Sequence, residues 1–311
     1  MSRAPAGTTT ADGSAVVKKP DVATTDKGIG GFAPAKINLA LHVTGQRADG
    51  YHLLDSLVGF AGLGDQITAT PADGLSLTVS GPFAQGVPLD DSNLVLRAAR
   101  VLQQARGVTR GATLRLTKSL PHAAGIGSAS SDAAATLRLL SDLWSVPPLS
   151  ADDPAVLTLG ADVPVCLGGP RPQLMSGIGE VLCPAPALPE AALVLVNPRV
   201  AVPTAAVFKA MTRRSNPAMA PLPKGCDLAA FAAWLAQGRN DMEAAAITIA
   251  PAIGTALALL RQMPGVLVAR MSGSGATCFA LVRDMGTARQ IAHAIQLRQM
   301  NWWVAPAPLL A

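Results

Sequence analysis

Alternating apolar and polar residues predict several strands along the chain. Residues 36–41 place an apolar side chain at every second position, and so do residues 111–118. Turn signals at Asp49-Gly50 and Gly64-Asp65 follow the first of these runs. Alternation or short apolar runs predict further strands at 66–70, 75–79, 192–196, 265–271 and 277–282, and the first two of these suggest a hairpin.

A longer period, of three to four residues, predicts helices between these strands. Residues 90–105 carry an apolar stripe behind Asp91 or Ser92, either of which can cap the helix. A second helix is expected at 131–144, and others at 155–159, from Thr204, from Leu228, at 251–263 and at 287–300. Because strands and helices mix without a regular βαβ repeat, the pattern favours the α+β class over a doubly wound sheet.

Length and composition indicate a globular protein with two domains. The chain has 311 residues, of which 50% are hydrophobic and 14% charged, and this excludes a largely disordered protein. Residues 1–30 are expected to form a disordered tail without a secretory signal. Three prolines in residues 184–189 predict a boundary between domains at 31–187 and 188–311. The longest charge-free run, 244–260, is too short to span a membrane, so a cytoplasmic protein without membrane contact is expected.

Charge and cysteine usage narrow the function classes. The net charge is +5 and the pI is near 9.3. No long basic run is present, so an anionic small-molecule substrate is favoured over nucleic acid. The four cysteines have no C-x-x-C spacing, which argues against a zinc site or a disulfide framework. Buried, reduced thiols are expected instead.

The most informative stretch is residues 120–140, where a loop of small residues runs into a helix. Backbone N–H groups of such a loop can approach a ligand, and the helix adds its partly positive N-terminus, so an anion cradle is predicted. A Walker P-loop is excluded because Ser130-Ser131-Asp132 stands where Lys and Ser or Thr are required. A dinucleotide fingerprint is disfavoured because Asp142, the acid near the expected distance, falls within a helix. A triphosphate held by amides and serine hydroxyls is the interpretation that fits.

Two further motifs give this loop a context. Residues 34–39 (PAKINL) open the fold, residues 121–131 form the loop, and residues 271–276 supply a second Gly-rich turn. This three-motif layout, from about Phe32 to the last helix, resembles the GHMP family of small-molecule kinases. The resemblance implies a two-domain GHMP kinase fold, with a ribosomal protein S5 domain 2-like N-terminal domain that binds ATP and an α/β-plait-like C-terminal domain. It also implies Mg²⁺ with the ATP.

Two other segments narrow the resemblance to part of that family. GQRADGYH at 45–52 and LGADVP at 159–164 resemble members that act on a cytidine diphosphate-linked methylerythritol. This implies ATP-dependent phosphorylation of the 2-hydroxyl of that substrate, in the non-mevalonate (MEP) pathway to isoprenoid precursors. Two alternatives stay open: a GHMP kinase for mevalonate, homoserine or a sugar, and a nucleic-acid binder, since related folds occur in ribosomal proteins. A monomer or a weak homodimer is expected.

The resemblance assigns catalysis to Lys36 and Asp162. A carboxylate that faces the phosphates can accept the proton of an attacking hydroxyl. A lysine beside it would keep the carboxylate ionised and steady the developing charge. Without the resemblance, Asp162 could simply cap a turn before Pro164, and Lys36 could be a solvated strand lysine.

The resemblance also supplies the remaining site residues. Around ATP it implies Asn93, Leu94, Pro121, His122, Ala123, Ala124, Gly125, Ile126, Gly127, Ser128, Ala129, Ser130 and Ser131. Around the acceptor it implies Tyr51, His52 and Phe208 at the cytosine, with Asn38, Gly273, Ser274 and Gly275. Core packing of Phe208 and a turn-anchoring role of Tyr51-His52 are the alternatives. No dedicated carboxylate cluster is visible, so Mg²⁺ would be held by phosphates, Ser131 and water.

The loop departs from the family pattern at four positions. Ala123, Ala124, Ser128 and Ala129 stand where family members commonly carry glycine. Alanine permits the close approach of a ligand at negative φ, but it does not cheaply adopt a positive φ. The departures therefore predict an altered loop shape and nucleotide affinity rather than a different reaction.

Overall fold

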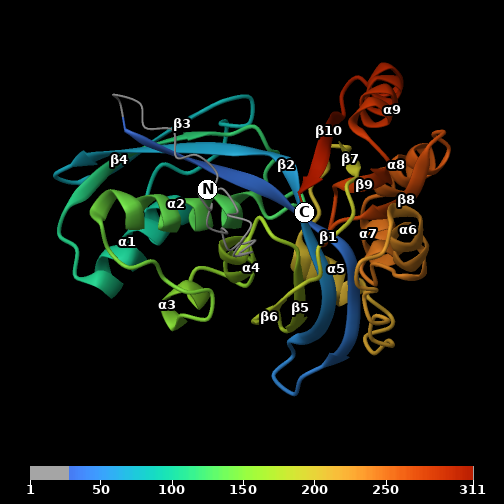
Figure 1. Ribbon diagram of the computed structural model, residues 1–311, viewed down its shortest axis with the longest axis horizontal. Helices are drawn as coiled ribbons and strands as arrows, with labels where there is room; N and C mark the ends of the chain where they lie inside the picture. Colours follow the sequence, from blue (N-terminus) through green and yellow to red (C-terminus); the bar gives the residue numbers. More distant parts are fainter. Residues whose placement is uncertain (1–27, 311) are drawn as a thin grey trace, which may run out of the picture.

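Two long antiparallel strands run through the molecule. The computed structural model describes residues 28–310 (Figure 1), so most of the predicted tail lies outside the described residues. β1 (Ile29–Gln46) and β2 (His52–Ala72) pair along nearly their whole length and extend from one half of the molecule into the other. The predicted turn at Asp49-Gly50 connects them.

The predicted turn at Gly64-Asp65 is wrong, because both residues lie inside β2. Gly64 pairs with Pro34 and Asp65 with Ala33. A Cβ at Gly64 would collide with the backbone of Ala33 and Pro34, so the glycine permits a close approach of the two strands and does not reverse the chain.

The hairpin predicted for 66–70 and 75–79 is also wrong. β3 (Leu75–Ser80) pairs in parallel with β4 (Gly111–Thr117), and β4 pairs antiparallel with β2. The strand predicted at 111–118 therefore lies between the other two. Alternation specifies which face of a strand is buried, but it does not specify which strand is its neighbour.

Helices α1 (Leu94–Arg106) and α2 (Ser128–Trp144) cover one face of this sheet (Figure 1). Their apolar sides and the sheet share a core that includes Leu102, Leu114 and Trp144. Two short helices, α3 (Pro154–Leu157) and α4 (Asp162–Gly168), follow, and then the hairpin β5 (Gln173–Gly177) and β6 (Val181–Pro184), whose first strand pairs with β2.

The first turns of both long helices differ from the prediction. α1 is capped by Asn93 and not by Asp91 or Ser92. Ser92 is not available as the cap because its hydroxyl donates to Asp90 at 2.6 Å. α2 begins directly after Gly127 rather than at residue 131, because the left-handed φ of 58° at this glycine turns the chain into the helix one turn earlier.

The C-terminal half contains the strands and helices predicted there, with two additions. Its sheet has the order β10–β7–β9–β8, from β7 (Ala192–Asn197), β8 (Val266–Met271), β9 (Cys278–Val282) and β10 (Trp303–Leu310). Its helices are α5 (Thr204–Ala210), α6 (Leu228–Gln237), α7 (Glu243–Ile249), α8 (Ala252–Arg261) and α9 (Met285–Arg298). α7 and β10 were not predicted. None of the helices between residues 28 and 310 is long and apolar enough to cross a membrane.

β10 joins the two halves. Pro306 and Pro308 interrupt the sequence pattern that would have marked it as a strand. It pairs with β7 along most of its length and with β2 at its end, so one hydrogen-bonded path crosses the molecule as β3–β4–β2–β10–β7–β9–β8. The boundary predicted between 187 and 188 falls between β6 and β7, and it stays a prediction.

The cysteines follow the prediction only in part. All four are free thiols. Cys166 and Cys278 are buried, and burial raises the pKa of the Cys166 thiol to about 12. Cys183 is exposed because β6 is a short edge strand with most of its residues at the surface, and Cys226 is half-buried.

Candidate active site

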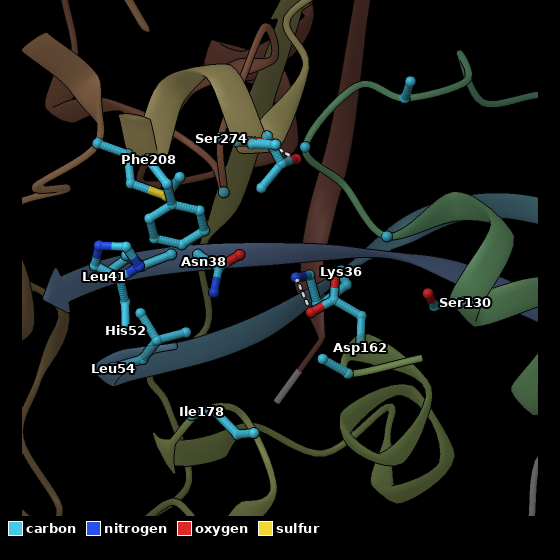
Figure 2. A pocket seen from close by; sticks show the side chains of 18 of the residues that line it. Lys36, Asn38, Leu41, His52, Leu54, Ser130, Asp162, Ile178, Phe208 and Ser274 are labelled. Atoms are coloured by element: carbon cyan, nitrogen blue, oxygen red, sulfur yellow. Dashed lines mark hydrogen bonds and ion pairs between the residues drawn. The ribbon is translucent and has the colours of Figure 1, made fainter. Parts of the chain in front are cut away.

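A cavity of about 950 Å³ opens where the two halves meet (Figure 2). Its walls come from β1, the loop at 121–127 (here the phosphate loop), the first turns of α2 and α4, and α5. It brings together most of the predicted site residues: Lys36, Asn38, Tyr51, His52, Ala123, Ala124, Gly125, Gly127, Ser128, Ala129, Ser130, Asp162, Phe208, Gly273 and Ser274.

Lys36 and Asp162 form an ion pair in this cavity. The Nζ atom of Lys36 lies 2.9 Å from Oδ1 of Asp162, and the lysine is buried whereas the Asp162 side chain is 40% exposed. The lysine is thus not a solvated strand residue. Asp162 is not a cap either, because it is the first residue of α4, where the partly positive helix end favours a carboxylate. The pair therefore places an accessible carboxylate beside a buried ammonium.

The phosphate loop packs directly against this pair. The amide of Lys36 donates to the carbonyl of Ile126 at 2.9 Å. A Cβ at Gly127 would lie 3.2 Å from the lysine side chain, so the end of the loop rests on it. Of the four departures from the family pattern, only Ala123 adopts a positive φ, of 45°. The departure is therefore a source of strain at one position only.

A serine of the C-terminal half connects the loop to β1. Ser272, fully buried within the second Gly-rich turn, donates its hydroxyl to the carbonyl of Gly125 at 2.9 Å and accepts the amide of Asn38 at 3.1 Å. A Cβ at Gly125 would collide with the backbone of Ser272 and Gly275. Glycine at 125 is therefore required both by this contact and by its φ of 74°.

The first turn of α2 faces the cavity with small residues. Ser128, Ala129 and Ser130 line the cavity, and the helix N-terminus adds partial positive charge. Ser131 is fully buried, and within residues 28–310 its hydroxyl has no hydrogen-bond partner. This end of the cavity can bind an anion through amides and hydroxyls.

Aromatic rings line the opposite end. Figure 2 shows His52 and Phe208 on one side of the Lys36–Asp162 pair and Ser130 on the other. The two rings stack on one another with centroids 4.4 Å apart and planes 15° apart. No base fits between rings at this separation, and the placement of His52 and Phe208 at the cytosine stays a prediction. A base has room only on an outer face of the stack.

Polar atoms at this end are left without partners. The side-chain nitrogen of Asn38 donates to Ser56, whose hydroxyl donates onward to the carbonyl of Ala40. This orients the amide and leaves Oδ1 of Asn38 buried and unpaired among the described residues, as is Nε2 of His52. Burial, followed by the nearby charge of Arg214, lowers the pKa of His52, so the ring is neutral at pH 7.

Comparisons with known proteins agree with this geometry. Residues 93–170 match the GHMP kinases N terminal domain and residues 224–300 match the GHMP kinases C terminal domain. A 4-diphosphocytidyl-2-C-methyl-D-erythritol kinase of Cereibacter sphaeroides is 56% identical over 281 residues, which cover 90% of this chain and 98% of that protein. The chain belongs to the 4-diphosphocytidyl-2-C-methyl-D-erythritol kinase family.

Other relatives separate this family from the wider fold. The kinase of the same name from Paramagnetospirillum magneticum is 53% identical over 283 residues, covering 90% of this chain and 98% of its own. A crystal structure of 4-(cytidine 5'-diphospho)-2C-methyl-D-erythritol kinase superposes with a TM-score of 0.72 at 32% identity, covering 91% of this chain and 99% of that one. A homoserine kinase from Cytophaga hutchinsonii superposes with a TM-score of 0.64 at 18% identity, covering 94% of this chain and 98% of that one. This likeness shows a shared fold alone.

Several residues predicted for this kinase site do not line the cavity. They are Asn93, Leu94, Pro121, His122, Ile126, Ser131 and Gly275. The side chain of Asn93 is used as the cap of α1 and as a donor to Pro88, and Ile126 belongs to the core. An adenine-side role for Asn93 and Leu94 stays a prediction.

A buried charge cluster beneath the phosphate loop was not predicted. Lys118 contacts the carboxylates of Asp65 and Asp132, and all three residues are buried. Burial raises the pKa of Asp132 to about 7, against the opposing charge of Lys118. The sequence did contain a signal, because Lys118 continues the buried face of β4 after Leu114 and Leu116.

Proposed function

We propose that this protein phosphorylates the 2-hydroxyl of 4-diphosphocytidyl-2-C-methyl-D-erythritol with ATP, in the non-mevalonate (MEP) isoprenoid precursor pathway. The observation that carries the proposal is the Lys36–Asp162 ion pair, which lies between an anion-binding loop and an aromatic pocket. Relatives at 50–56% identity across most of the chain carry the name of this enzyme.

Lys36 and Asp162 are the proposed catalytic residues. Asp162 accepts the proton of the attacking hydroxyl, and its 40% exposure leaves the carboxylate within reach of a ligand. The ammonium of Lys36, held at 2.9 Å, orients that carboxylate and balances negative charge as the phosphoryl group moves. Because phosphoryl transfer has a loose transition state, positioning should contribute more than proton removal.

ATP is the donor that the GHMP kinase family implies. Its phosphates would lie along the amides of the phosphate loop and the start of α2. Within the described part of the chain, no cluster of three or more His, Cys, Asp or Glu side chains could hold a metal. A Mg²⁺ ion would therefore be held mainly by the phosphates and water and would neutralise phosphate charge, while Ser131, which is fully buried and does not line the cavity, stays a predicted ligand only.

The acceptor would occupy the aromatic end of the cavity. Its cytosine would stack on an outer face of the His52–Phe208 pair, and Nε2 of His52, which bonds in the plane of its ring, would bind a different polar group of the acceptor. Oδ1 of Asn38 would accept a hydrogen bond from the methylerythritol part, because an unpaired buried oxygen there favours a ligand that satisfies it. Tyr51, 60% exposed, stands at the rim.

A substrate panel tests the proposal. The purified protein is assayed with ATP and Mg²⁺ against 4-diphosphocytidyl-2-C-methyl-D-erythritol, mevalonate, homoserine and galactose. We expect turnover with the cytidine-linked substrate alone. A preference for any acceptor without cytidine would assign the protein to another GHMP activity, and RNA binding without ATP turnover would contradict a kinase altogether.

A further inference from the structure

The phosphate loop is held at both of its ends by buried charges. Four residues, Asp65, Lys118, Ser128 and Asp132, form one hydrogen-bonded group, here called the stem clamp. None of the three charged members lines the cavity, so they do not serve the ligand by direct contact. Each is nonetheless at least nine-tenths buried.

The carboxylate of Asp65 binds both stems of the loop. Its Oδ1 accepts the amides of Ser119 and Leu120, at 2.6 and 2.9 Å, immediately before the loop begins. Its Oδ2 accepts the hydroxyl of Ser128, at 2.8 Å, immediately after the loop ends. One side chain from β2 therefore sets the distance between the entry and the exit of the loop.

Lys118 connects the same two stems through its ammonium group. Its ammonium contacts Asp65 and the hydroxyl of Ser128, and it lies 2.7 Å from Oδ2 of Asp132 in α2. Burying one ammonium with two carboxylates is a poor way to stabilise a fold, since apolar residues of similar volume serve as well or better. The charged groups instead fix the geometry of the loop stems, because charge-assisted hydrogen bonds are short and directional.

A loop of small residues needs such support. The chain from 121 to 127 has few side chains that could pack and hold its shape, and it turns through positive φ at Ala123, Gly125 and Gly127. Its amides can bind phosphate well only if they point to one place before the ligand arrives. The only other anchors in the described residues are at the middle and end of the loop, through Ala124, Gly125 and Ile126.

We propose that Asp65 and Lys118 are positioning residues for the phosphoryl donor, which fix the stems of the phosphate loop so that its amides are arranged for the phosphates of ATP. The inference rests on the proposed function for the identity of the donor. It concerns nucleotide binding only. The stem clamp does not contact the acceptor end of the cavity, so no change in acceptor binding is predicted.

The test compares Asp65→Asn and Lys118→Met with the unchanged protein. We expect the KM for ATP and the Kd for ADP to rise about tenfold or more, as for the loss of charged hydrogen bonds, while the KM for the acceptor changes less than about twofold. Leu140→Ala is the control, because Leu140 is a fully buried residue of α2, far along the helix from the loop. It should lower the melting temperature without a selective effect on nucleotide.

Other results would overturn the inference. An unchanged Kd for ADP in a folded Asp65→Asn variant would show that the clamp serves stability alone, and so would equal rises in both KM values. If Lys118→Met does not fold, Asp132→Asn removes a charge from the stem clamp at a residue that does not line the cavity, and it must show the same selective rise in the Kd for ADP. A chain that fails to phosphorylate the cytidine substrate would refute the proposed function. The Kd for ADP would still test the stem clamp in that case, because ADP binding needs no acceptor.

Discussion

The two ends of the cavity are built in different ways. The end proposed for the donor offers backbone amides of a loop that is hydrogen-bonded to buried neighbours: Asp65 and Lys118 at the stems and Ser272 in the middle. The acceptor end offers side chains, and two of their polar atoms, on Asn38 and His52, have no partner within the described residues. The donor end also contains a hydroxyl that is unpaired among residues 28–310, that of Ser131, but Ser131 does not line the cavity, whereas Asn38 and His52 line it and can present their unpaired atoms to a ligand.

This difference separates the effects of substitution. A substitution at the donor end should change the shape of the loop and so weaken all of its contacts with the phosphates. A change at the acceptor end should remove one contact and affect one part of one substrate. The Lys36–Asp162 pair lies between the ends and belongs to neither, so it should affect the chemical step.

The largest effect is expected from the pair itself. Asp162→Asn keeps the shape of the side chain but removes the charge that accepts the proton, so kcat should fall about 10²- to 10⁴-fold with both KM values little changed. Steady-state rates against each substrate measure this. Asp142→Asn, at an exposed position of α2 outside the cavity, is the control and should be inert. Near-normal turnover by the Asp162→Asn variant would rule out Asp162 as the base that accepts the proton.

The next effect is expected at the aromatic stack. Phe208→Ala should raise the KM of the acceptor by about 10- to 100-fold, by analogy with other stacked bases, and leave the KM for ATP unchanged. Phe208→Leu separates stacking from packing, because leucine restores apolar volume beside the core without a ring. Full recovery of the acceptor KM in Phe208→Leu would favour core packing, the alternative raised by the sequence.

Acidity should affect the acceptor end through His52. Its pKa lies below the ordinary 6.5, because burial and Arg214 disfavour the charged ring. The neutral ring therefore predominates at pH 6.5 and above, and the acceptor KM should be lowest near pH 8 and show most of its rise below pH 6.5. Stability should change in the same direction. Because the unfolded chain binds the proton of His52 more tightly, the contribution of His52 to the free energy of unfolding should fall as the pH falls through about 6.5. His52→Gln should abolish the rise. A rise in the acceptor KM with its midpoint above pH 6.5 would contradict the account, in which the neutral ring of His52 binds the acceptor.

The smallest effect is expected in the loop. Ala123 has a positive φ of 45°, which is unfavourable for alanine by about 1–2 kcal/mol, and glycine would regain part of this despite its greater freedom when unfolded. Ala123→Gly should therefore raise the free energy of unfolding by up to about 1 kcal/mol, measured by denaturant titration. Ala129→Gly, in the first turn of α2, should lower it by a similar amount. A loss of stability in Ala123→Gly equal to that control would show that the strain is absent.

Sequence patterns indicated several of the residues that line the cavity, because these residues lie in local motifs. The period-two run at Lys36 and the small-residue loop before α2 lie within single elements, so their burial and ligand chemistry are visible in a short window. The ion pair of Lys36 with Asp162 joins residues far apart in the chain, and it was expected only from the family resemblance.

The features that were missed depend on which strands are neighbours. Asp65 lies 53 residues before Lys118, and Gly64-Asp65 imitates a turn while serving a close contact of two strands. β10 was missed because two prolines mask its pattern, although it joins the halves of the molecule. The stacking of His52 on Phe208 follows from the meeting of β2 and α5, which no local pattern specifies.

The central claim is that the Lys36–Asp162 pair lies where the acceptor hydroxyl meets the donor phosphate. A crystal structure with a non-hydrolysable ATP analogue and 4-diphosphocytidyl-2-C-methyl-D-erythritol tests it most directly. We predict the 2-hydroxyl oxygen within about 3 Å of a carboxylate oxygen of Asp162, facing a γ-phosphate that lies along residues 121–127. A 2-hydroxyl bound out of reach of Asp162, or a γ-phosphate directed away from it, would contradict the account.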